Sequence, residues 1–306
     1  MPELPEVHIT ATMLHRLVTG IHISAVWTDY GSPHHTQKDN IKNPKFFRSL
    51  KRKILGSRFT KVSRRGKNVL LELDNGETIL VHMKMTGHIL YGNYLYDKKK
   101  DTWTAAEEKS PLSDFRNQFI HFVITLSDGK HLVLSDMRKF AKVTIIPTKN
   151  LETSDHLASI GPEPLETSFD FPEFKNRLLT KPRGAIKQVL MNPEVVAGIG
   201  NIYSDEILFA SGIHPLSTTS KIPEQKLERM FRATKEILRK GIDFGGDSTS
   251  DYRNPLGVHG KFQYHHQAYR NTGKPCGQKG CPGTIRKLKL GGRSAHFCDI
   301  HQCKYN

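Results

Sequence analysis

The first six residues of the chain, Met-Pro-Glu-Leu-Pro-Glu, place a secondary amine beside two carboxylates. If Met1 is removed, Pro2 carries a free imino nitrogen, which can attack the aldehyde carbon of a sugar and form an iminium ion. Glu3 and Glu6 are then candidates to move protons around that amine. The same residues also suit the beginning of a helix, because proline fits the first turn and acidic side chains fit its positive end. Taken alone, the segment leaves both interpretations open.

A second candidate site is the segment Gly198-Ile199-Gly200-Asn201, which comes just before a stretch of helical periodicity. Glycines allow a ligand to approach the backbone closely, and the amides and dipole at a helix start favour a phosphate. The Asn201 side chain could cap the helix or donate a hydrogen bond to that phosphate. The motif alone does not separate these two roles.

The four cysteines all lie between residues 276 and 303. A local cluster is typical of metal ligation in a reducing compartment, whereas a disulfide framework usually spreads through a small secreted chain. Cys276 and Cys281 form one pair, and Cys298 forms another with either His301 or Cys303. Two such pairs of ligands on either side of a hairpin are typical of a zinc ribbon, which holds one structural zinc ion. The two-residue spacer after Cys298 favours His301 as the fourth ligand.

Between these pairs, residues 285–297 have the pattern of two strands joined by a Gly291-Gly292 turn. Arg293 follows the turn, where its side chain could enter a DNA groove. The C-terminal segment is too short and too polar to bury a core of its own, so we expect the metal to supply most of its stability.

The charge of the chain predicts a polyanionic partner. Lys and Arg number 46 against 30 Asp and Glu, which gives a formal net charge of +16. Residues 38–67 hold twelve basic side chains and one acid, and residues 270–306 hold eight and one. Two separated basic regions suit a protein that grips nucleic acid, although a solvated basic surface or RNA binding would give the same composition. No apolar run reaches membrane-spanning length and no signal core is present, so we expect a soluble intracellular protein.

Hydrophobic spacing predicts a β-rich first half and a helical second half. After an amphipathic helix that begins near Val7, strand–turn–strand patterns cover residues 69–81 and 119–134. Residues 93–115 are polar and indicate a surface insertion. Prolines punctuate residues 148–172, which predicts a linker, and the periodicity beyond it is helical.

In this order along the chain, the motifs resemble those of the bacterial formamidopyrimidine-DNA glycosylase family. The matching segments are Pro2–Val7, Ala197–Tyr203 with Asp205 and Glu206, Gly212–Pro215 and the terminal zinc hairpin. The resemblance covers the whole chain apart from the insertion. It implies an α+β fold with an N-terminal antiparallel β-sandwich and an initial helix, followed by a helix–two-turn–helix domain and a zinc ribbon. The expected boundaries are 1–147 for the catalytic sandwich, 148–172 for the linker, 173–268 for the DNA-binding helices and 269–306 for the ribbon.

The resemblance also implies a bifunctional DNA glycosylase and abasic-site lyase of base excision repair. Such an enzyme removes oxidised purines (8-oxoguanine and formamidopyrimidines) from double-stranded DNA through a proline Schiff base and β,δ-elimination. Leu4 favours the formamidopyrimidine branch, because the endonuclease VIII branch more often has Gly there. The alternatives are an endonuclease VIII-like enzyme for oxidised pyrimidines and a non-catalytic DNA-damage-binding protein. We expect a monomer in the bacterial cytoplasm, associated with the nucleoid and with no membrane partner.

For the catalytic residues, the resemblance implies that Pro2 is the nucleophile, that Glu3 helps to open and protonate the sugar ring, and that Glu6 orders the site. Lys67 matches a lysine that contacts phosphate beside the lesion. The DNA-binding residues implied by the family fall into two groups. Those that fill the void left by an extruded base are Met85, Arg138 and Phe140, and those that contact phosphates are Lys187, Asn201, Tyr269 and Arg293.

Two further features follow from the resemblance. The segment Gly245–Ser250 resembles a mobile loop that covers the damaged base, and its glycines and small polar residues suit a lid. The zinc motif departs from the family pattern, because His301 stands where a cysteine is expected and the first cysteine pair is two residues wider. Asn192 also stands where an acid is common.

Overall fold

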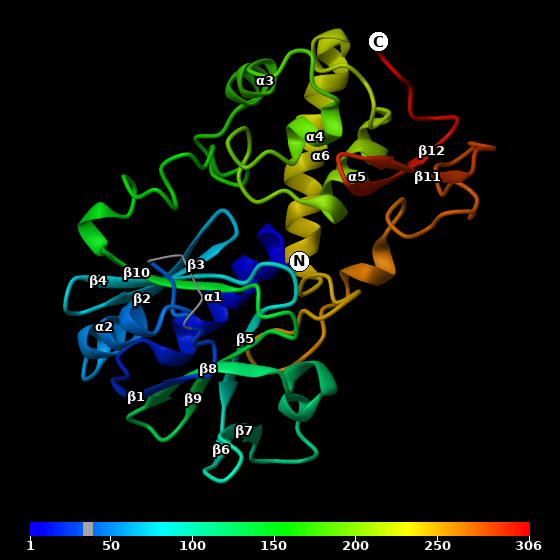
Figure 1. Ribbon diagram of the computed structural model, residues 1–306. Helices are drawn as coiled ribbons and strands as arrows, with labels where there is room; N and C mark the ends of the chain where they lie inside the picture. The colour runs from blue at the N-terminus through cyan, green and yellow to red at the C-terminus, as the bar shows by residue number, and fades with distance from the viewer. Residues whose placement is uncertain (33–38) are drawn as a thin grey trace. The chain divides into compact units, whose positions relative to one another are not determined.

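The computed structural model describes residues 1–32 and 39–306, which form two compact units. The first unit contains Met1–Ala158 together with Phe244–Lys261, and the second contains Ser159–Asp243 together with Phe262–Asn306. The chain therefore enters the second unit, returns to the first for 18 residues, and then completes the second. Figure 1 shows the elements of both units along the chain.

The first unit is built on two antiparallel sheets that form a β-sandwich (Figure 1). One sheet has the strand order β1 (Ile23–Thr28), β8 (Ile120–Leu126), β9 (His131–Ser135) and β5 (His88–Gly92). The other has the order β10 (Lys142–Pro147), β4 (Glu77–His82), β3 (Asn68–Leu73) and β2 (Phe59–Arg65). The Asn75-Gly76 and Asp128-Gly129 turns join β3 to β4 and β8 to β9 as predicted, with both glycines at positive φ.

Helix α1 (Leu4–Val18) packs against β2 and β3, and α2 (Pro44–Ile54) lies in the same unit. The predicted apolar face of α1 is buried, because Val7, Leu14 and Val18 join residues from both sheets in one core. Burying each such side chain stabilises the fold by about 1.5–3 kcal/mol. The beginning of α1 is therefore fixed to the sandwich by its own hydrophobic face.

The predicted insertion is a folded structure. It forms the hairpin β6 (Tyr94–Asp97) and β7 (Thr102–Ala105), followed by the short 3-10 helices η1 (Pro111–Ser113) and η2 (Phe115–Asn117). Tyr94 is buried in a small second core with Leu90 and Val133, and Trp103 packs against it. The insertion is therefore held to the sandwich by a core of its own, despite its polar composition.

The second unit combines four helices, within the described residues, with one hairpin. The helices are α3 (Phe171–Leu179), α4 (Ile186–Leu190), α5 (Asn201–Ser211) and α6 (Glu224–Asp243), and the hairpin is β11 (Ile285–Leu290) with β12 (Arg293–Cys298). Helix α5 ends at Gly212 in the left-handed conformation, with φ of 69°, which glycine adopts readily. The hairpin turns at Gly291-Gly292, both at positive φ, so Leu290 pairs with Arg293.

Candidate active site and nucleic-acid interface

The N-terminal segment is buried and its two acids hold each other in place. Glu3 is the N-cap of α1, and its side chain accepts from the backbone of Glu6. In return, the Glu6 carboxylate accepts a hydrogen bond of 2.7 Å from the Glu3 backbone N–H. This reciprocal capping box fixes the residue that follows Pro2. The helix-start interpretation of the motif is therefore correct, and it leaves Pro2 buried directly before the N-cap residue Glu3.

Glu6 is also held by the segment that returns from the second unit. Its other carboxylate oxygen accepts from the Asp247 backbone N–H at 2.8 Å, and its carbonyl accepts from the Tyr252 hydroxyl at 3.1 Å. A Cβ atom at Gly246 would lie about 3.1 Å from the Glu6 side chain, and Gly246 has φ of +83°, so glycine is needed for this approach. The predicted lid segment thus contacts the N-terminal motif in this structure.

Lys67 lies in the turn between β2 and β3, next to Gly66 at positive φ, and is partly exposed. It lies close enough to His82 to affect that ring. Burial, followed by the ammonium groups of Lys84 and Lys67, lowers the pKa of His82 to about 3. His82 is therefore neutral, and its Nδ1 accepts from the Lys84 backbone N–H at 3.0 Å. His82 therefore adds no positive charge to that of Lys67 and Lys84.

The structure brings the three predicted void-filling residues together. Met85 and Phe140 are exposed by 45% and 48%. The Arg138 guanidinium lies 4.4 Å from the centroid of the Phe140 ring, and its Nη1 lies 3.0 Å from the Met85 sulfur. Two exposed apolar side chains joined by a cation are unusual on a protein surface but suit insertion into a base stack.

Buried Asp136 positions the loops that carry this trio. Its carboxylate accepts from the Thr86 hydroxyl, from the Ala141 backbone N–H at 2.7 Å and from the Tyr30 hydroxyl at 2.9 Å. The Arg138 backbone N–H then donates to the Thr86 hydroxyl at 3.1 Å. One carboxylate therefore links the β4–β5 loop to the β9–β10 loop.

In the second unit, Asn201 begins α5 but does not cap it. The N-cap is Gly200, and no side-chain cap is formed. Gly198 has φ of +82°, which supplies the tight turn before the helix. The Asn201 Oδ1 atom is buried and has no hydrogen-bond partner among the described residues. The capping role considered for Asn201 is thus wrong, and its side chain retains hydrogen-bonding capacity at the helix start.

Lys187 is not placed as a surface phosphate contact. It is only 1% exposed, and its ammonium lies 2.5 Å from Asp205 and 2.8 Å from the Ser294 carbonyl. Asp205 also accepts from the backbone N–H and the ring of His296, at 3.0 and 2.8 Å. The apolar pattern around residues 186–190 places Lys187 on the inner face of α4, where a charge must be paired. Lys187 therefore joins α4 and α5 to the hairpin strand β12.

Glu206 fixes the chain around Tyr269. Its buried carboxylate accepts three backbone hydrogen bonds, from Gln267, Ala268 and Tyr269, at 2.8, 3.0 and 2.8 Å. Burial raises the pKa of Glu206 even though these bonds act in the opposite direction. Tyr269 is partly exposed, and its ring packs edge-on against His296.

The four residues predicted as metal ligands form one cluster. One ligand atom from each of Cys276, Cys281, Cys298 and His301 lies within 4.8 Å of the others. The Cys281 and Cys298 sulfurs are 3.6 Å apart, and Cys276 Sγ lies 3.2 Å from His301 Nδ1. Four thiolates and imidazoles around a tetrahedral ion with bonds of about 2.3 Å would be separated by about 3.8 Å, so this donor set fits zinc.

The surroundings explain why His301 rather than Cys303 belongs to the cluster. His301 Nε2 lies 3.0 Å from the Phe209 carbonyl, which favours a proton on that nitrogen and leaves Nδ1 for a metal. Cys303 is exposed and its backbone pairs with Gly212 and His214. The tail also shares a small core with α5, because Ile285 packs with Phe209. It therefore has apolar support that its own sequence did not reveal.

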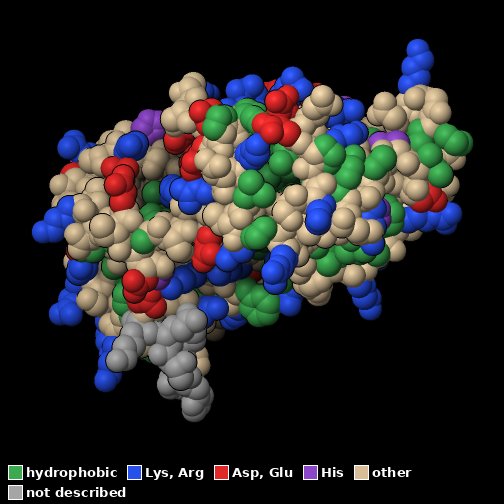
Figure 2. Space-filling model, turned by 90° about the horizontal axis from the view of Figure 1, so that it is seen from above, with side chains coloured by type: hydrophobic (Ala, Val, Ile, Leu, Met, Phe, Trp, Pro, Cys, Tyr) green, Lys and Arg blue, Asp and Glu red, His purple; other side chains and the backbone are tan. Residues whose placement is uncertain are grey.

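Arg293 is exposed at the tip of the hairpin, directly after the two-glycine turn. Lys and Arg side chains are spread across the face of the molecule shown in Figure 2. These basic side chains are exposed to solvent, where they can contact phosphate groups.

Three functional positions were missed by the sequence analysis: Asp136, Asp247 and Tyr252. Asp136 lies two residues before Arg138, but its sequence position does not show that its carboxylate joins two loops. The Asp247 contact is made through the backbone, which no side-chain motif can reveal. Tyr252 lies 246 positions from Glu6, and nothing local indicates their hydrogen bond.

Together, a β-sandwich with a buried proline–acid start and a helical unit with a Cys3His ribbon define a DNA glycosylase of base excision repair. The formamidopyrimidine-DNA glycosylase N-terminal domain model matches residues 1–143, and the formamidopyrimidine-DNA glycosylase H2TH domain model matches residues 160–253. The chain belongs to the formamidopyrimidine-DNA glycosylase family.

Similar proteins match the chain along its whole length. The formamidopyrimidine-DNA glycosylase of Herpetosiphon aurantiacus is 32% identical over 306 residues, covering 99% of this chain and 100% of that one. That of Pelotomaculum thermopropionicum is 32% identical, covering 99% of each chain. Among solved structures, Lactococcus lactis Fpg with DNA containing an abasic site is 30% identical with a TM-score of 0.81, covering 99% of this chain and 100% of that one. MutM with DNA containing carbocyclic 8-oxo-G is 30% identical with a TM-score of 0.80 and the same coverage.

Within the described parts of the chain, none of the helices has both the length and the apolar character needed to cross a membrane.

Proposed function

We propose that this glycosylase excises oxidised purines, 8-oxoguanine and formamidopyrimidines, and then cuts the DNA strand as an abasic-site lyase. The observation that carries the proposal is the buried Pro2 beside Glu3, with Glu6 fixing the backbone between them. A glycosylase that only hydrolysed the base would not need an N-terminal secondary amine. Solved relatives in complex with DNA that contains Fapy-dG, 8-oxo-G or an abasic site support the substrate class.

The proposed reaction starts after Met1 is removed. The Pro2 nitrogen attacks C1′ of the deoxyribose, and the bond from C1′ to the base breaks, so the base leaves with its electron pair and takes up a proton. Glu3 protonates the ring oxygen, the sugar opens, and an iminium links Pro2 to C1′. Loss of a proton from C2′ then expels the 3′ phosphate, and a second elimination expels the 5′ phosphate. Hydrolysis of the iminium returns the free amine.

The other residues of the first unit would hold the DNA around this chemistry. Lys67 would contact the phosphate beside the lesion, since it supplies positive charge at the β2–β3 corner. Met85, Arg138 and Phe140 would fill the gap left by the flipped nucleotide, because a wedge, a cation and a ring replace the lost stacking.

In the second unit, we propose that Asn201, Tyr269 and Arg293 contact phosphates. The position of Asn201 at the first residue of α5 supports this, because helix starts favour anions. For Lys187, burial supports a positioning role, in which it fixes α5 and β12 through Asp205. Cys276, Cys281, Cys298 and His301 would hold one structural zinc ion, which on binding supplies stability rather than reaction chemistry.

We also propose that the protein acts as a monomer on damaged double-stranded DNA in the bacterial cytoplasm, close to the nucleoid. The domain limits expected from the sequence remain part of the proposal, with residues 244–261 packed in the first unit.

The proposal is tested with a panel of duplexes under borohydride. Duplexes carrying 8-oxoguanine, a formamidopyrimidine, an oxidised pyrimidine or no lesion are incubated with the protein and a reductant that fixes iminium ions. We expect covalent adducts with the two purine lesions and strand products with phosphate at both ends. Faster reaction with the oxidised pyrimidine would indicate an endonuclease VIII-like enzyme. Binding without an adduct on any lesion would indicate a non-catalytic protein.

A further inference from the structure

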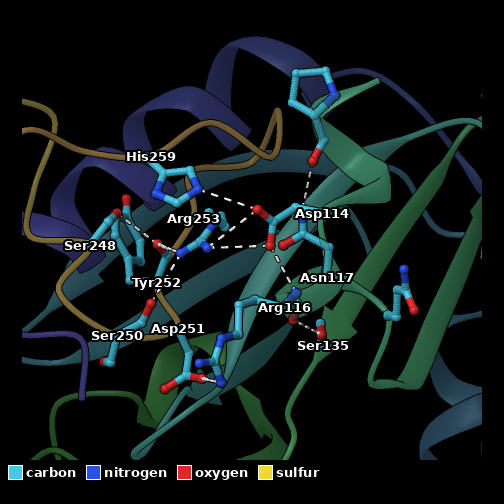
Figure 3. A network of polar contacts seen from close by, with 12 residues as sticks. Asp114, Arg116, Asn117, Ser135, Ser248, Ser250, Asp251, Tyr252, Arg253 and His259 are labelled. Atoms are coloured by element: carbon cyan, nitrogen blue, oxygen red, sulfur yellow. Dashed lines mark hydrogen bonds and ion pairs between the residues drawn. The ribbon is translucent and has the colours of Figure 1, made fainter. Parts of the chain in front are cut away.

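The end of the insertion, residues 111–117, lies against the segment 251–260 in the first unit (Figure 3). The two backbones are in close contact, because a Cβ atom at Gly257 would lie 2.6 Å from the backbone of Pro111. Gly257 has φ of +81°, so both its conformation and its space exclude a side chain. The contact depends on close fit as well as on charge.

Asp114 is the centre of this contact. Its carboxylate accepts from the Arg253 guanidinium at 3.3 and 3.4 Å, and His259 Nε2 lies 3.3 Å from it. The Arg253 side chain is only 5% exposed, so its charge requires this partner. A second ion pair, between Arg116 and Asp251 at 3.1 Å, joins the same two segments. Figure 3 shows Arg253 and His259 pointing toward Asp114 from the returning segment.

The segment that carries Asp114 is itself fixed to the sandwich. Asn117, which is buried, donates to the Pro111 carbonyl and pairs with the ring of buried His88, both at 2.8 Å. The Ser135 hydroxyl donates to the Arg116 carbonyl at 3.0 Å. Strands β5 and β9 thus give residues 111–117 a rigid base, against which the returning segment is placed.

From Arg253 the hydrogen bonds continue to the N-terminus. Its guanidinium donates to the carbonyls of Ser250 and Tyr252, at 3.1 and 2.9 Å, and so fixes the bend between them. The Tyr252 hydroxyl and the Asp247 backbone N–H then donate to Glu6, which in turn accepts from the Glu3 backbone N–H. Burial raises the pKa of Tyr252, so its hydroxyl stays protonated as a donor.

We propose that Asp114 is a positioning residue that, through Arg253 and the segment 247–253, sets the orientation of Glu6 and hence of the Pro2–Glu3 start. This inference rests on the function proposed above for Pro2 and Glu3. Residues 111–117 therefore supply the fixed point from which the returning segment holds the N-terminal motif, whereas the β6–β7 hairpin takes no part in this contact.

The experiment measures the single-turnover rate of borohydride trapping on an abasic-site duplex, together with duplex affinity. Asp114→Asn keeps the size of the side chain and removes its charge. We expect the trapping rate to fall roughly 10- to 100-fold, because small displacements of reacting groups have effects of that order. Duplex affinity should stay within about twofold of the wild type, and Asp114→Glu should restore most of the rate.

Asp97→Asn is the matched control, since Asp97 lies in the same insertion, at the β6–β7 turn, and its ion pair with Lys100 is exposed. This variant should trap at the wild-type rate. Arg116→Met provides a second variant should Asp114→Asn not fold, and it should lower the trapping rate several-fold without changing affinity. The double variant Arg253→Met with Asp114→Asn should have a trapping rate no lower than that of Arg253→Met alone, because Asp114 is proposed to act through Arg253.

The outcomes separate this inference from the proposed function. A wild-type protein that forms no adduct would overturn both. A wild-type protein that traps normally, with folded Asp114→Asn and Arg116→Met variants at the same rate, would overturn only the role of Asp114. Equal losses of trapping and of duplex affinity would also overturn it, since they would point to a DNA contact.

Discussion

The two ends of the chain are held by different physical means. The N-terminal motif begins a helix whose apolar face is part of the main core of the first unit, and hydrogen bonds from Asp247 and Tyr252 add to it. The C-terminal ribbon shares only a small core with α5 and gathers Cys276, Cys281, Cys298 and His301 in one cluster that could hold a metal ion. Hydrophobic burial is thus the main support of the proposed nucleophile, whereas we propose that metal ligation is the main support of the ribbon.

This difference is informative about function. A nucleophile must be held within a fraction of an ångström, and a large core with redundant hydrogen bonds gives that precision. The proposed role of the hairpin, to place Arg293 against a phosphate, requires only correct position, which a bound metal ion can supply in a short segment. The comparison predicts that the two regions respond separately to perturbation.

Removing the metal should have the largest effect, confined to the ribbon. Zinc binding should contribute on the order of 10 kcal/mol to the folding of this segment, as in finger peptides. Elemental analysis should find about one zinc per chain, and a strong chelator should expose residues 269–306 to proteolysis and lower DNA affinity. The sandwich should keep its melting transition.

The matched pair His301→Ala and Cys303→Ala sharpens this test. His301→Ala should lose zinc affinity, while Cys303→Ala should keep it, because the Cys303 sulfur lies outside the ligand cluster. The opposite result would reassign the fourth ligand. A zinc-free protein with an ordered ribbon and full activity would contradict the metal site itself.

Pro2→Gly tests the other end of the chain. We expect base excision to fall on the order of 1000-fold or more, since the rigid secondary amine of proline is replaced by the primary amine of a flexible glycine, while duplex affinity and zinc content stay unchanged. Retention of Met1 should have the same effect, because the nitrogen is then part of a peptide bond. Single-turnover excision of 8-oxoguanine measures both, and a variant with Met1 retained that cuts at the normal rate would exclude the proline.

Lys187→Met should affect stability more than charge recognition. It leaves Asp205 buried without its ammonium partner, which should cost about 3 kcal/mol in the free energy of unfolding of the second unit. The control is Lys175→Met, whose exposed ion pair with Glu224 contributes under about 1 kcal/mol. Denaturant titration measures both. A Lys187→Met protein of normal stability, with weaker and less salt-dependent DNA binding, would restore the phosphate role.

The smallest effects are expected at the surface contacts. Arg293→Ala should reduce the salt slope of DNA affinity by about one, because one phosphate contact is lost. Asn201→Ala should weaken binding equally at all salt concentrations, since a neutral side chain releases no counterion. Arg286→Ala on the same hairpin is the control, because its guanidinium is paired with Asp299 at 2.8 Å. DNA affinities are measured over a range of salt concentrations. A larger loss of affinity in Arg286→Ala than in Arg293→Ala or Asn201→Ala would contradict the phosphate contacts proposed for Arg293 and Asn201.

Local patterns predicted much of this molecule. The spacing of apolar residues gave α1, the Asn-Gly and Asp-Gly turns gave two hairpins, and Gly212 marked the end of α5, because each depends on residues close in sequence. The donor set Cys276, Cys281, Cys298 and His301 was also readable from its spacing.

Contacts between segments far apart in the chain could not be predicted from the sequence. The return of residues 244–261 to the first unit and the Asp114–Arg253 pair join segments more than 100 positions apart, and no periodicity records such contacts. The burial of Lys187 could not be predicted either, because a lysine motif does not show whether its helix face is buried. Nothing in the structure explains why Asn192 stands where an acid is common. Its side chain accepts a hydrogen bond from the Glu194 backbone N–H.

The central claim is that the Pro2 nitrogen forms the covalent bond to DNA. The most direct test is to trap the wild-type protein on an 8-oxoguanine duplex with borohydride, digest the complex and locate the modified residue by mass spectrometry. We predict a single modified peptide that begins at Pro2, with the sugar remnant on its nitrogen. An adduct on a lysine such as Lys67, or base release with no adduct on the N-terminal peptide, would contradict the claim.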